Sequence, residues 1–252
     1  MRCLPEWKAP NSLGYIDSWG FDFPMTQVTI IKTGGTAPSL RVRRGDFEDW
    51  ILAGMEFSVD GNVEVLDVAA GRALPNPKRA GKIVITGSHD MVTDRLEWSE
   101  RTASWLAEAV SAGAPILGIC YGHQLLAHAL GGSVDYNPRG QETGTTEISL
   151  LAAAWSDPLL CGLPARIKVH VSHSQSVIRL PAAAVRLAEN EWDRNQAFRF
   201  GPCVWGVQFH PEFDADIMRT YAHEKPLPPG IEIIDTPFGG RILKRFASLT
   251  MG

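Results

Sequence analysis

The chain has 252 residues, 44% of them hydrophobic and 21% charged, and it carries a formal net charge of −4. A chain of this length can bury the core of one large α/β domain, and its slightly acidic balance argues against a nucleic-acid partner. No apolar run approaches the roughly 18 residues of a membrane span, and the N-terminus lacks the basic and apolar segments of a secretory signal. We therefore expect a cytoplasmic protein with no membrane or nucleic-acid partner.

The cysteine spacing and the loop composition argue against several kinds of cofactor site. The four cysteines, at positions 3, 120, 161 and 203, are irregularly spaced and form no Cys-x-x-Cys pair. This spacing argues against a zinc or thioredoxin-like site, and the pair His170 and His173 lacks a third metal ligand. The chain also lacks a glycine-rich phosphate loop followed by Lys-Ser or Lys-Thr. We expect reduced thiols, no metal and no cofactor.

The first half of the chain alternates predicted strands with predicted helices. Residues 1–25 show no periodicity and are interpreted as an irregular N-terminal arm, so the folded domain comprises residues 26–252. β-Branched runs predict strands, and apolar residues three and four positions apart predict helices. These patterns give strands over 27–32, 63–68 and 82–86 and near Ile116, and helices over 47–55, over 96–112 and from after Cys120 to about Leu130.

The second half is richer in predicted strands. These cover residues 145–151, 167–172, 177–180, 197–200 and 204–209, the last two forming a hairpin across Gly201-Pro202. Helices are predicted near 217–223 and over 238–249. Strands that alternate with helices favour parallel pairing with helices packed on both faces of the sheet. The sequence therefore predicts a three-layer α/β fold with a mostly parallel central sheet.

A short stretch around Cys120 has the pattern of a nucleophile elbow. An apolar run ends at Gly118-Ile119-Cys120-Tyr121-Gly122, and a helical pattern follows at once. Glycines two residues to either side of the thiol allow a tight strand-to-helix turn that a side chain would obstruct. At a helix N-terminus, the helix dipole and the free amides favour a thiolate. Cys120 is therefore the predicted nucleophile.

A histidine near the end of a later predicted strand can serve as the base. His210 follows Val204-Trp205-Gly206-Val207-Gln208-Phe209, and Glu212 comes two residues later. Active sites of α/β folds gather at the carboxyl ends of strands. A carboxylate at this spacing can accept a hydrogen bond from the imidazole and fix its tautomer and orientation. Cys120, His210 and Glu212 thus form a predicted nucleophile, base and orienting group.

An acyl-transfer site also needs donors for the oxyanion. The amide directly after the nucleophile, on Tyr121, is the usual first donor at an elbow. A second donor is expected from a neighbouring strand-to-helix loop, and the Gly87-Ser88 turn after the strand at 82–86 is the best candidate. The predicted oxyanion hole is therefore formed by Gly87 and Tyr121.

Two motifs together resemble the signatures of class I glutamine amidotransferases. They are Gly118-Ile119-Cys120-Tyr121-Gly122-His123-Gln124 and Trp205-Gly206-Val207-Gln208-Phe209-His210-Pro211-Glu212, while Thr86-Gly87-Ser88 resembles the family's oxyanion loop. The resemblance covers roughly residues 63–213. It implies the flavodoxin-like three-layer fold of that family. It also implies hydrolysis of the side-chain amide of glutamine to glutamate and ammonia, through a γ-glutamyl thioester on Cys120.

The resemblance further implies which residues bind the substrate. Gln124 matches a position beside the bound glutamine, and Ser172-His173-Ser174-Gln175 matches a stretch that faces the substrate's α-amino and carboxylate groups. The substrate-binding residues are accordingly expected to be Ser88, Gln124, His173 and Ser174. In the guanylate-synthase-like branch this stretch usually reads Ser-His-Gly-Asp, so Ser174 and Gln175 depart from it. A hydrolase of other γ-glutamyl amides or peptides therefore remains an alternative.

Members of this family mostly pass their ammonia to a synthase on the same chain or on a partner. About 40 residues follow Glu212, which are too few for a synthase domain. We therefore expect a stand-alone amidotransferase-like enzyme that acts on a small molecule and can supply a separate ammonia-accepting synthase. A non-catalytic regulatory subunit of the same fold is the third interpretation.

Overall fold

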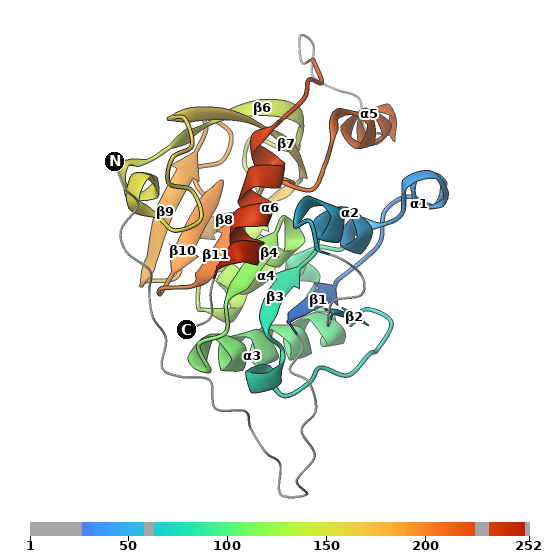
Figure 1. Ribbon diagram of the computed structural model, residues 1–252, viewed down its shortest axis with the longest axis vertical. Coiled ribbons are helices and arrows are strands. Elements are labelled where there is room, and N and C mark those ends of the chain that lie inside the picture. Colours follow the sequence, from blue (N-terminus) through green and yellow to red (C-terminus); the bar gives the residue numbers. More distant parts are fainter. Residues whose placement is uncertain (1–26, 58–62, 225–231, 250–252) are drawn as a thin grey trace, which may run out of the picture.

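The computed structural model describes residues 27–57, 63–224 and 232–249. The predicted irregular arm over residues 1–25 lies outside these ranges. Within them, the chain forms a large central sheet with helices packed against it (Figure 1).

The central sheet has nine strands and divides into a parallel and an antiparallel half. The strands are β1 (Val28–Lys32), β2 (Val63–Asp67), β3 (Lys82–Ile85), β4 (Ile116–Ile119), β6 (Glu142–Leu150), β7 (Arg166–His173), β9 (Ala184–Glu189), β10 (Ala197–Phe200) and β11 (Val204–Val207). Their order across the sheet is β2-β1-β3-β4-β11-β10-β9-β6-β7. Neighbours from β2 to β11 pair in parallel, and neighbours from β11 to β7 pair antiparallel. A separate antiparallel pair consists of β5 (Ser133–Tyr136) and β8 (Gln175–Arg179).

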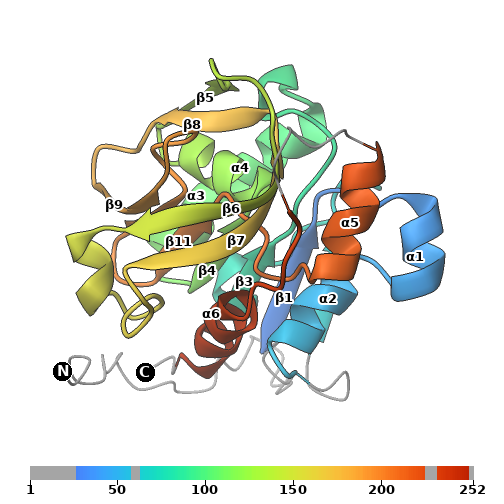
Figure 2. The same ribbon diagram turned by 90° about the horizontal axis from the view of Figure 1, so that it is seen from above.

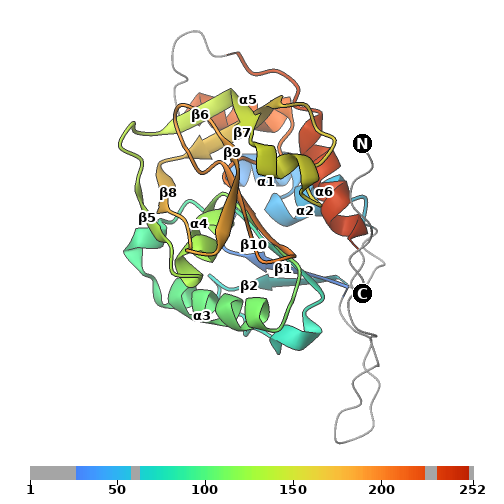
Figure 3. The same cartoon turned by 90° about the vertical axis from the view of Figure 1, so that its left-hand side faces the viewer.

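Helices cover both faces of this sheet. Helices α3 (Glu97–Ser111) and α4 (Tyr121–Ala129) lie on one face, and α2 (Phe47–Gly54) and α6 (Phe238–Ser248) lie on the other (Figure 3). Helices α1 (Pro38–Arg44) and α5 (Ala215–Glu224) lie side by side at one edge (Figure 2). Ion pairs from Arg44 to Asp214 and Asp216 join this edge pair. The predicted three-layer α/β fold is confirmed.

The strands in the middle of the parallel half are buried on both sides. Ile83, Val84 and Ile85 of β3 are fully buried, as are Ile116 and Leu117 of β4. Continuous apolar runs of this kind are expected where helices cover both faces of a parallel sheet. These runs explain why the sequence predicts these strands so closely.

Every predicted strand and helix within the described ranges occurs, with ends no more than about three residues from those expected. One helix, α1, and two strands, β5 and β9, are additional to the prediction. Only Leu40 is buried in α1, and β5 has no buried residue. Elements that bury so little apolar surface carry no clear periodic pattern in the sequence.

The topology brings three of the predicted site residues to the same end of neighbouring parallel strands. Strand β4 lies between β3 and β11 and runs parallel to both. Gly87 therefore follows β3, Cys120 directly follows β4, and His210 lies three residues after β11, all at the carboxyl ends of neighbouring parallel strands. The carboxyl ends of the strands are where α/β folds bind their ligands.

Candidate active site

Cys120 lies in a strained turn between β4 and α4. Its backbone has φ +51° and ψ −101°, and it is one of the few non-glycine residues with positive φ in the described ranges. A Cβ on Gly118 would lie 2.4 Å from the carbonyl oxygen of Gly122. A Cβ on Gly122 would lie 2.5 Å from the carbonyl oxygen of Ile85. The two glycines are therefore required by close backbone approach, and the unfavourable φ falls on the cysteine itself.

His210 is held by hydrogen bonds and by an aromatic ring. Its Nδ1 donates to Oε1 of Glu212 at 2.8 Å, and its backbone amide donates to the carbonyl of His170 at 2.8 Å. The ring of Phe213 stacks on the imidazole with 4.0 Å between centroids and 15° between planes, and Phe47 lies further out at 6.3 Å. With Nδ1 bound to Glu212, Nε2 is the nitrogen left for the thiol.

The thiol and the imidazole shift each other's protonation. Burial alone would raise the pKa of Cys120, but the charge of His210 and its hydrogen bond to the thiol lower that pKa below its usual value. Burial alone would lower the pKa of His210. The negative charges of Glu212 and Cys120, with the hydrogen bonds that the imidazolium donates to both, instead raise this pKa to about 10. These opposite shifts favour a thiolate–imidazolium pair near neutral pH.

A narrow cavity of about 50 Å³ opens onto this pair. Seven of the predicted site residues line it: Ser88, Cys120, Tyr121, Gln124, His173, Ser174 and His210. The other two, Glu212 and Gly87, are neighbours of His210. Glu212 binds its Nδ1, and a Cβ on Gly87 would lie 3.1 Å from its Cε1. The structure therefore brings all nine predicted residues together.

The predicted oxyanion donors come from the elbow and from the loop that follows β3. Tyr121 is the first residue of α4, where backbone amides have no partner within the helix. Gly87 follows β3, and its carbonyl accepts from the hydroxyl of Thr33 at 3.1 Å. The amide of Gly122 donates to the carbonyl of Thr86 at 3.2 Å, which ties the elbow to this loop.

Two predicted substrate-binding residues are already engaged within the protein. Nε2 of Gln124 donates to the carbonyl of Gln175 at 2.8 Å and to Oε1 of Gln208 at 3.0 Å. His173 is hydrogen bonded through both ring nitrogens, to the carbonyl of Gln175 and to Glu142, each at 2.9 Å. The imidazole of His173 thus has no free nitrogen to offer a substrate.

Several residues at the site were not identified from the sequence. Phe47, His89, Met91 and Tyr221 line the cavity, and His89 stacks on Tyr221 with 6.1 Å between ring centroids. Phe47 lies in α2, Tyr221 in α5, and His89 and Met91 in the loop after β3, so only the folded chain brings these three segments together. Phe213 could have been found, because it follows His210 by three residues within the same motif.

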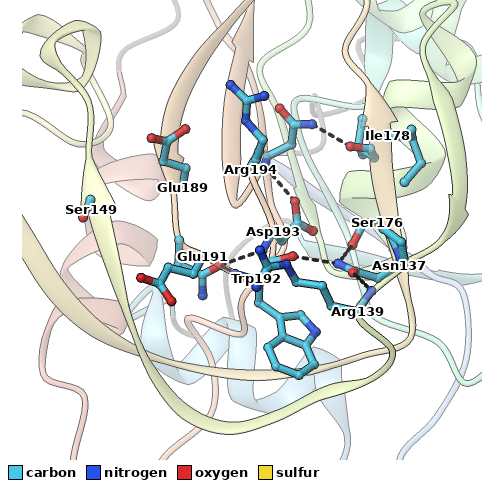
Figure 4. A pocket seen from close by; sticks show the side chains of 14 residues that line it. Asn137, Arg139, Ser149, Ser176, Ile178, Glu189, Glu191, Trp192, Asp193 and Arg194 are labelled. Atoms are coloured by element: carbon cyan, nitrogen blue, oxygen red, sulfur yellow. Dashed lines mark hydrogen bonds between the residues drawn. The ribbon is translucent and has the colours of Figure 1, made fainter.

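A larger cavity, of about 560 Å³, shares no lining residue with the first (Figure 4). The loop between β9 and β10 forms much of its wall, with Glu191, Trp192, Asp193 and Arg194. None of the predicted site residues lines it.

In the described ranges, no group of three or more His, Cys, Asp and Glu side chains is placed to hold a metal ion. No helix among the same residues is long and apolar enough to cross a membrane.

Comparison with known proteins points to one family. The model of the family described as glutamine amidotransferase class-I matches residues 55–224, which are 170 of the 252 residues. The glutamine-hydrolyzing GMP synthase of Aeropyrum pernix is 42% identical over 144 residues, covering 57% of this chain and 26% of that protein. One subunit of the glutamine-hydrolyzing GMP synthase of Methanopyrus kandleri is 34% identical over 123 residues, covering 46% of this chain and 64% of that relative. The chain thus matches less than two thirds of the length of either relative.

Solved structures share the fold at lower sequence identity. A glutamine amido transferase from Methylobacillus flagellatus superposes with a TM-score of 0.67 at 23% identity, covering 88% of this chain and 91% of that one. A glutamine amidotransferase from Thermotoga maritima gives a TM-score of 0.64 at 22% identity, with 88% and 90% covered. With the family model matching about two thirds of its length, the chain belongs to the class I glutamine amidotransferase family.

Proposed function

We propose that the protein hydrolyses the side-chain amide of glutamine to glutamate and ammonia, through a thioester on Cys120. The observation that carries this proposal is the buried set of Cys120, His210 and Glu212 at the carboxyl ends of β4 and β11. The lowered pKa of the thiol and the raised pKa of the imidazole suit a nucleophile paired with a general acid. Glutamine hydrolysis is also the activity in the names of the relatives from A. pernix and M. kandleri.

The reaction follows from the roles of these groups. The thiolate of Cys120 attacks the amide carbon, and the amides of Tyr121 and Gly87 stabilise the oxyanion that forms. The imidazolium of His210 then protonates the departing nitrogen, ammonia leaves and the thioester remains. Neutral His210 next takes a proton from water, which attacks the thioester and restores the thiolate–imidazolium pair. Glu212 keeps Nε2 of His210 directed at these atoms throughout.

We further propose that the ammonia serves a separate synthase in the cytoplasm. The relative from M. kandleri is named as one subunit of a synthase, which is the arrangement this proposal requires. A reduced thiol at position 120 suits the reducing cytoplasm.

A second candidate is the hydrolysis of larger γ-glutamyl amides. It is favoured by Ser174, which lines the cavity and departs from the family stretch expected there. A panel of glutamine and γ-glutamyl amines, monitored for ammonia, free amine and glutamate, separates the two. Amine release without glutamine turnover would favour the second candidate.

The direct test is substitution of the nucleophile. We expect Cys120→Ala to abolish glutaminase activity while leaving the melting temperature close to that of the parent protein. Cys203→Ala is a matched control, because Cys203 is a buried thiol whose pKa burial raises. Undiminished turnover in the Cys120 variant would refute the proposal. Absence of turnover in the parent protein, with no reaction of Cys120 toward a glutamine-like electrophile, would favour a non-catalytic role.

A further inference from the structure

A second buried histidine–carboxylate pair lies beside the cavity. His173 on β7 and Glu142 on β6 are directly opposite each other in the antiparallel register. Nε2 of His173 lies 2.9 Å from Oε2 of Glu142, and the two side chains are only 1% and 8% exposed. Cross-strand partners at this spacing contact each other. The pair of His210 and Glu212 therefore has a counterpart at the same cavity, which both histidines line.

The hydrogen bonds of His173 define its protonation. Its Nδ1 lies 2.9 Å from the carbonyl oxygen of Gln175, which can only accept, so Nδ1 carries a proton. Its Nε2 faces a carboxylate. A carboxyl group has a lower ordinary pKa than an imidazole, so the shared proton belongs on Nε2. The hydrogen bonds therefore favour a doubly protonated, positively charged ring, and, against the effect of burial, the carboxylate of Glu142 raises the pKa of His173.

The surroundings of Glu142 keep it as an acceptor. Asn190 donates to Oε1 at 2.7 Å, and Gln196 donates to Oε2 at 2.9 Å. The amide of Asn190 cannot turn round, because its own oxygen accepts from the amides of Trp192 and Asp193. These two residues belong to the loop seen in Figure 4. The carboxylate thus receives three donors, one of them fixed in orientation.

The charge on His173 lies within electrostatic range of the thiol and acts to lower its pKa. Both residues line the same cavity, and Sγ of Cys120 is 3.8 Å from the carbonyl oxygen of Ser172, the residue before His173. Because both ring nitrogens are already bonded, the imidazole can act on Cys120 through its charge and not through a new hydrogen bond. A positive charge at this range favours a thiolate over a thiol.

We propose that Glu142 is a positioning residue that holds His173 as a buried imidazolium, and that this second cation stabilises the thiolate of Cys120. Here Cys120 is taken as the nucleophile of the proposed function, and both experiments below are performed without substrate. The ionisable groups that face His173 are Glu142 on β6, Asp193 in the β9–β10 loop, Cys120 at the elbow and His123 on α4. Both carboxylates favour the charged ring.

The substitution Glu142→Gln removes the charge with little change in shape. Asn190 requires an oxygen at its position, so the new amide nitrogen must face Nε2 of His173. Two donors cannot share that contact, so His173 gives up a proton and becomes neutral. The rate of Cys120 alkylation by iodoacetamide rises with pH as the thiol becomes a thiolate. We expect the midpoint of this rise, the acid limb, to move up by about one pH unit. The control is Glu147→Gln, at an exposed position of β6 where Glu147 forms an ion pair with Arg166, and it should leave the limb unchanged.

An unchanged acid limb in a folded Glu142→Gln protein would overturn the proposal. If that variant does not fold, the parent protein decides the question. Long-range proton–nitrogen NMR of ¹⁵N-histidine-labelled protein at pH 8, with His173 assigned through His173→Gln, reports the protons on each ring nitrogen. We expect two protons on His173 at this pH, well above the ordinary histidine pKa of roughly 6.5. A neutral ring would overturn the proposal and leave glutamine hydrolysis by Cys120 untouched.

Discussion

Replacing Gly122 by alanine tests whether the elbow depends on close backbone packing. The new Cβ would lie 2.5 Å from the carbonyl oxygen of Ile85 and 2.7 Å from its Cβ. Ordinary carbon contacts lie near 3.5–4.0 Å, so α4 and β3 would have to separate by roughly 1 Å. Overpacking of this kind costs about 1–3 kcal/mol, which corresponds to a melting temperature lower by about 2–12 °C for a domain of this size.

The same displacement moves the thiol relative to His210. A misplacement of about 1 Å at a reacting group can cost on the order of 10²-fold in rate, so we expect a comparable loss of glutaminase kcat. Gly240→Ala is the matched control, because Gly240 lies in helix α6 and a Cβ there would meet nothing within 4 Å. That control should stabilise the protein by about 0.5–1 kcal/mol. A Gly122→Ala protein with parental melting temperature and kcat would refute the packing argument.

Two further substitutions test the electrostatics of the site. His210→Ala removes the cation that lowers the pKa of Cys120. Alkylation of Cys120 by iodoacetamide at pH 7 should therefore slow by at least about tenfold. An alkylation rate equal to that of the parent protein would contradict the pairing of Cys120 with His210. Phe213→Leu removes the ring stacked at 4.0 Å on the imidazole. A desolvated cation–π contact is worth about 1–2 kcal/mol, and about 1.4 kcal/mol corresponds to one pKa unit. The alkaline limb of kcat/KM reports groups of the free enzyme, in which the pKa of His210 is raised to about 10. Since the ring favours the protonated form, its loss should move this limb down by about one pH unit. Phe198→Leu is the control, because Phe198 contacts His123 at 5.0 Å instead, and equal limbs in both variants would contradict the role of Phe213.

The inner strands of the parallel half of the sheet could be predicted from the sequence because they are almost entirely apolar. Ile83-Val84-Ile85 is buried on both faces, and such a run is readable without knowing its neighbours. Helix α1 could not be predicted in this way. It buries only Leu40, and its contacts are ion pairs with residues about 170 positions away, such as Arg44 with Asp214.

The site residues also divide into those visible in a local motif and those defined by distant contacts. Cys120, His210 and Glu212 each stand in a local motif whose turn chemistry is visible in the sequence. Glu142 differs from them, because its partner His173 is 31 residues away and is defined only by the register of β6 against β7. A shift of one residue in that register would turn the carboxylate to the other face. The counterpart pair was therefore accessible only from the folded chain.

The central claim is that Cys120 forms an acyl-enzyme with glutamine. The most direct test is rapid acid quenching of the protein during turnover of glutamine, followed by intact mass spectrometry and peptide mapping. We predict one γ-glutamyl adduct, located on the peptide that contains Cys120, and its absence in the Cys120→Ala variant. Slower thioester hydrolysis at low pH should increase the trapped fraction, because neutral His210 is needed to activate water. Glutamine turnover with no adduct on Cys120, or an adduct on Cys161 or Cys203, would contradict the account.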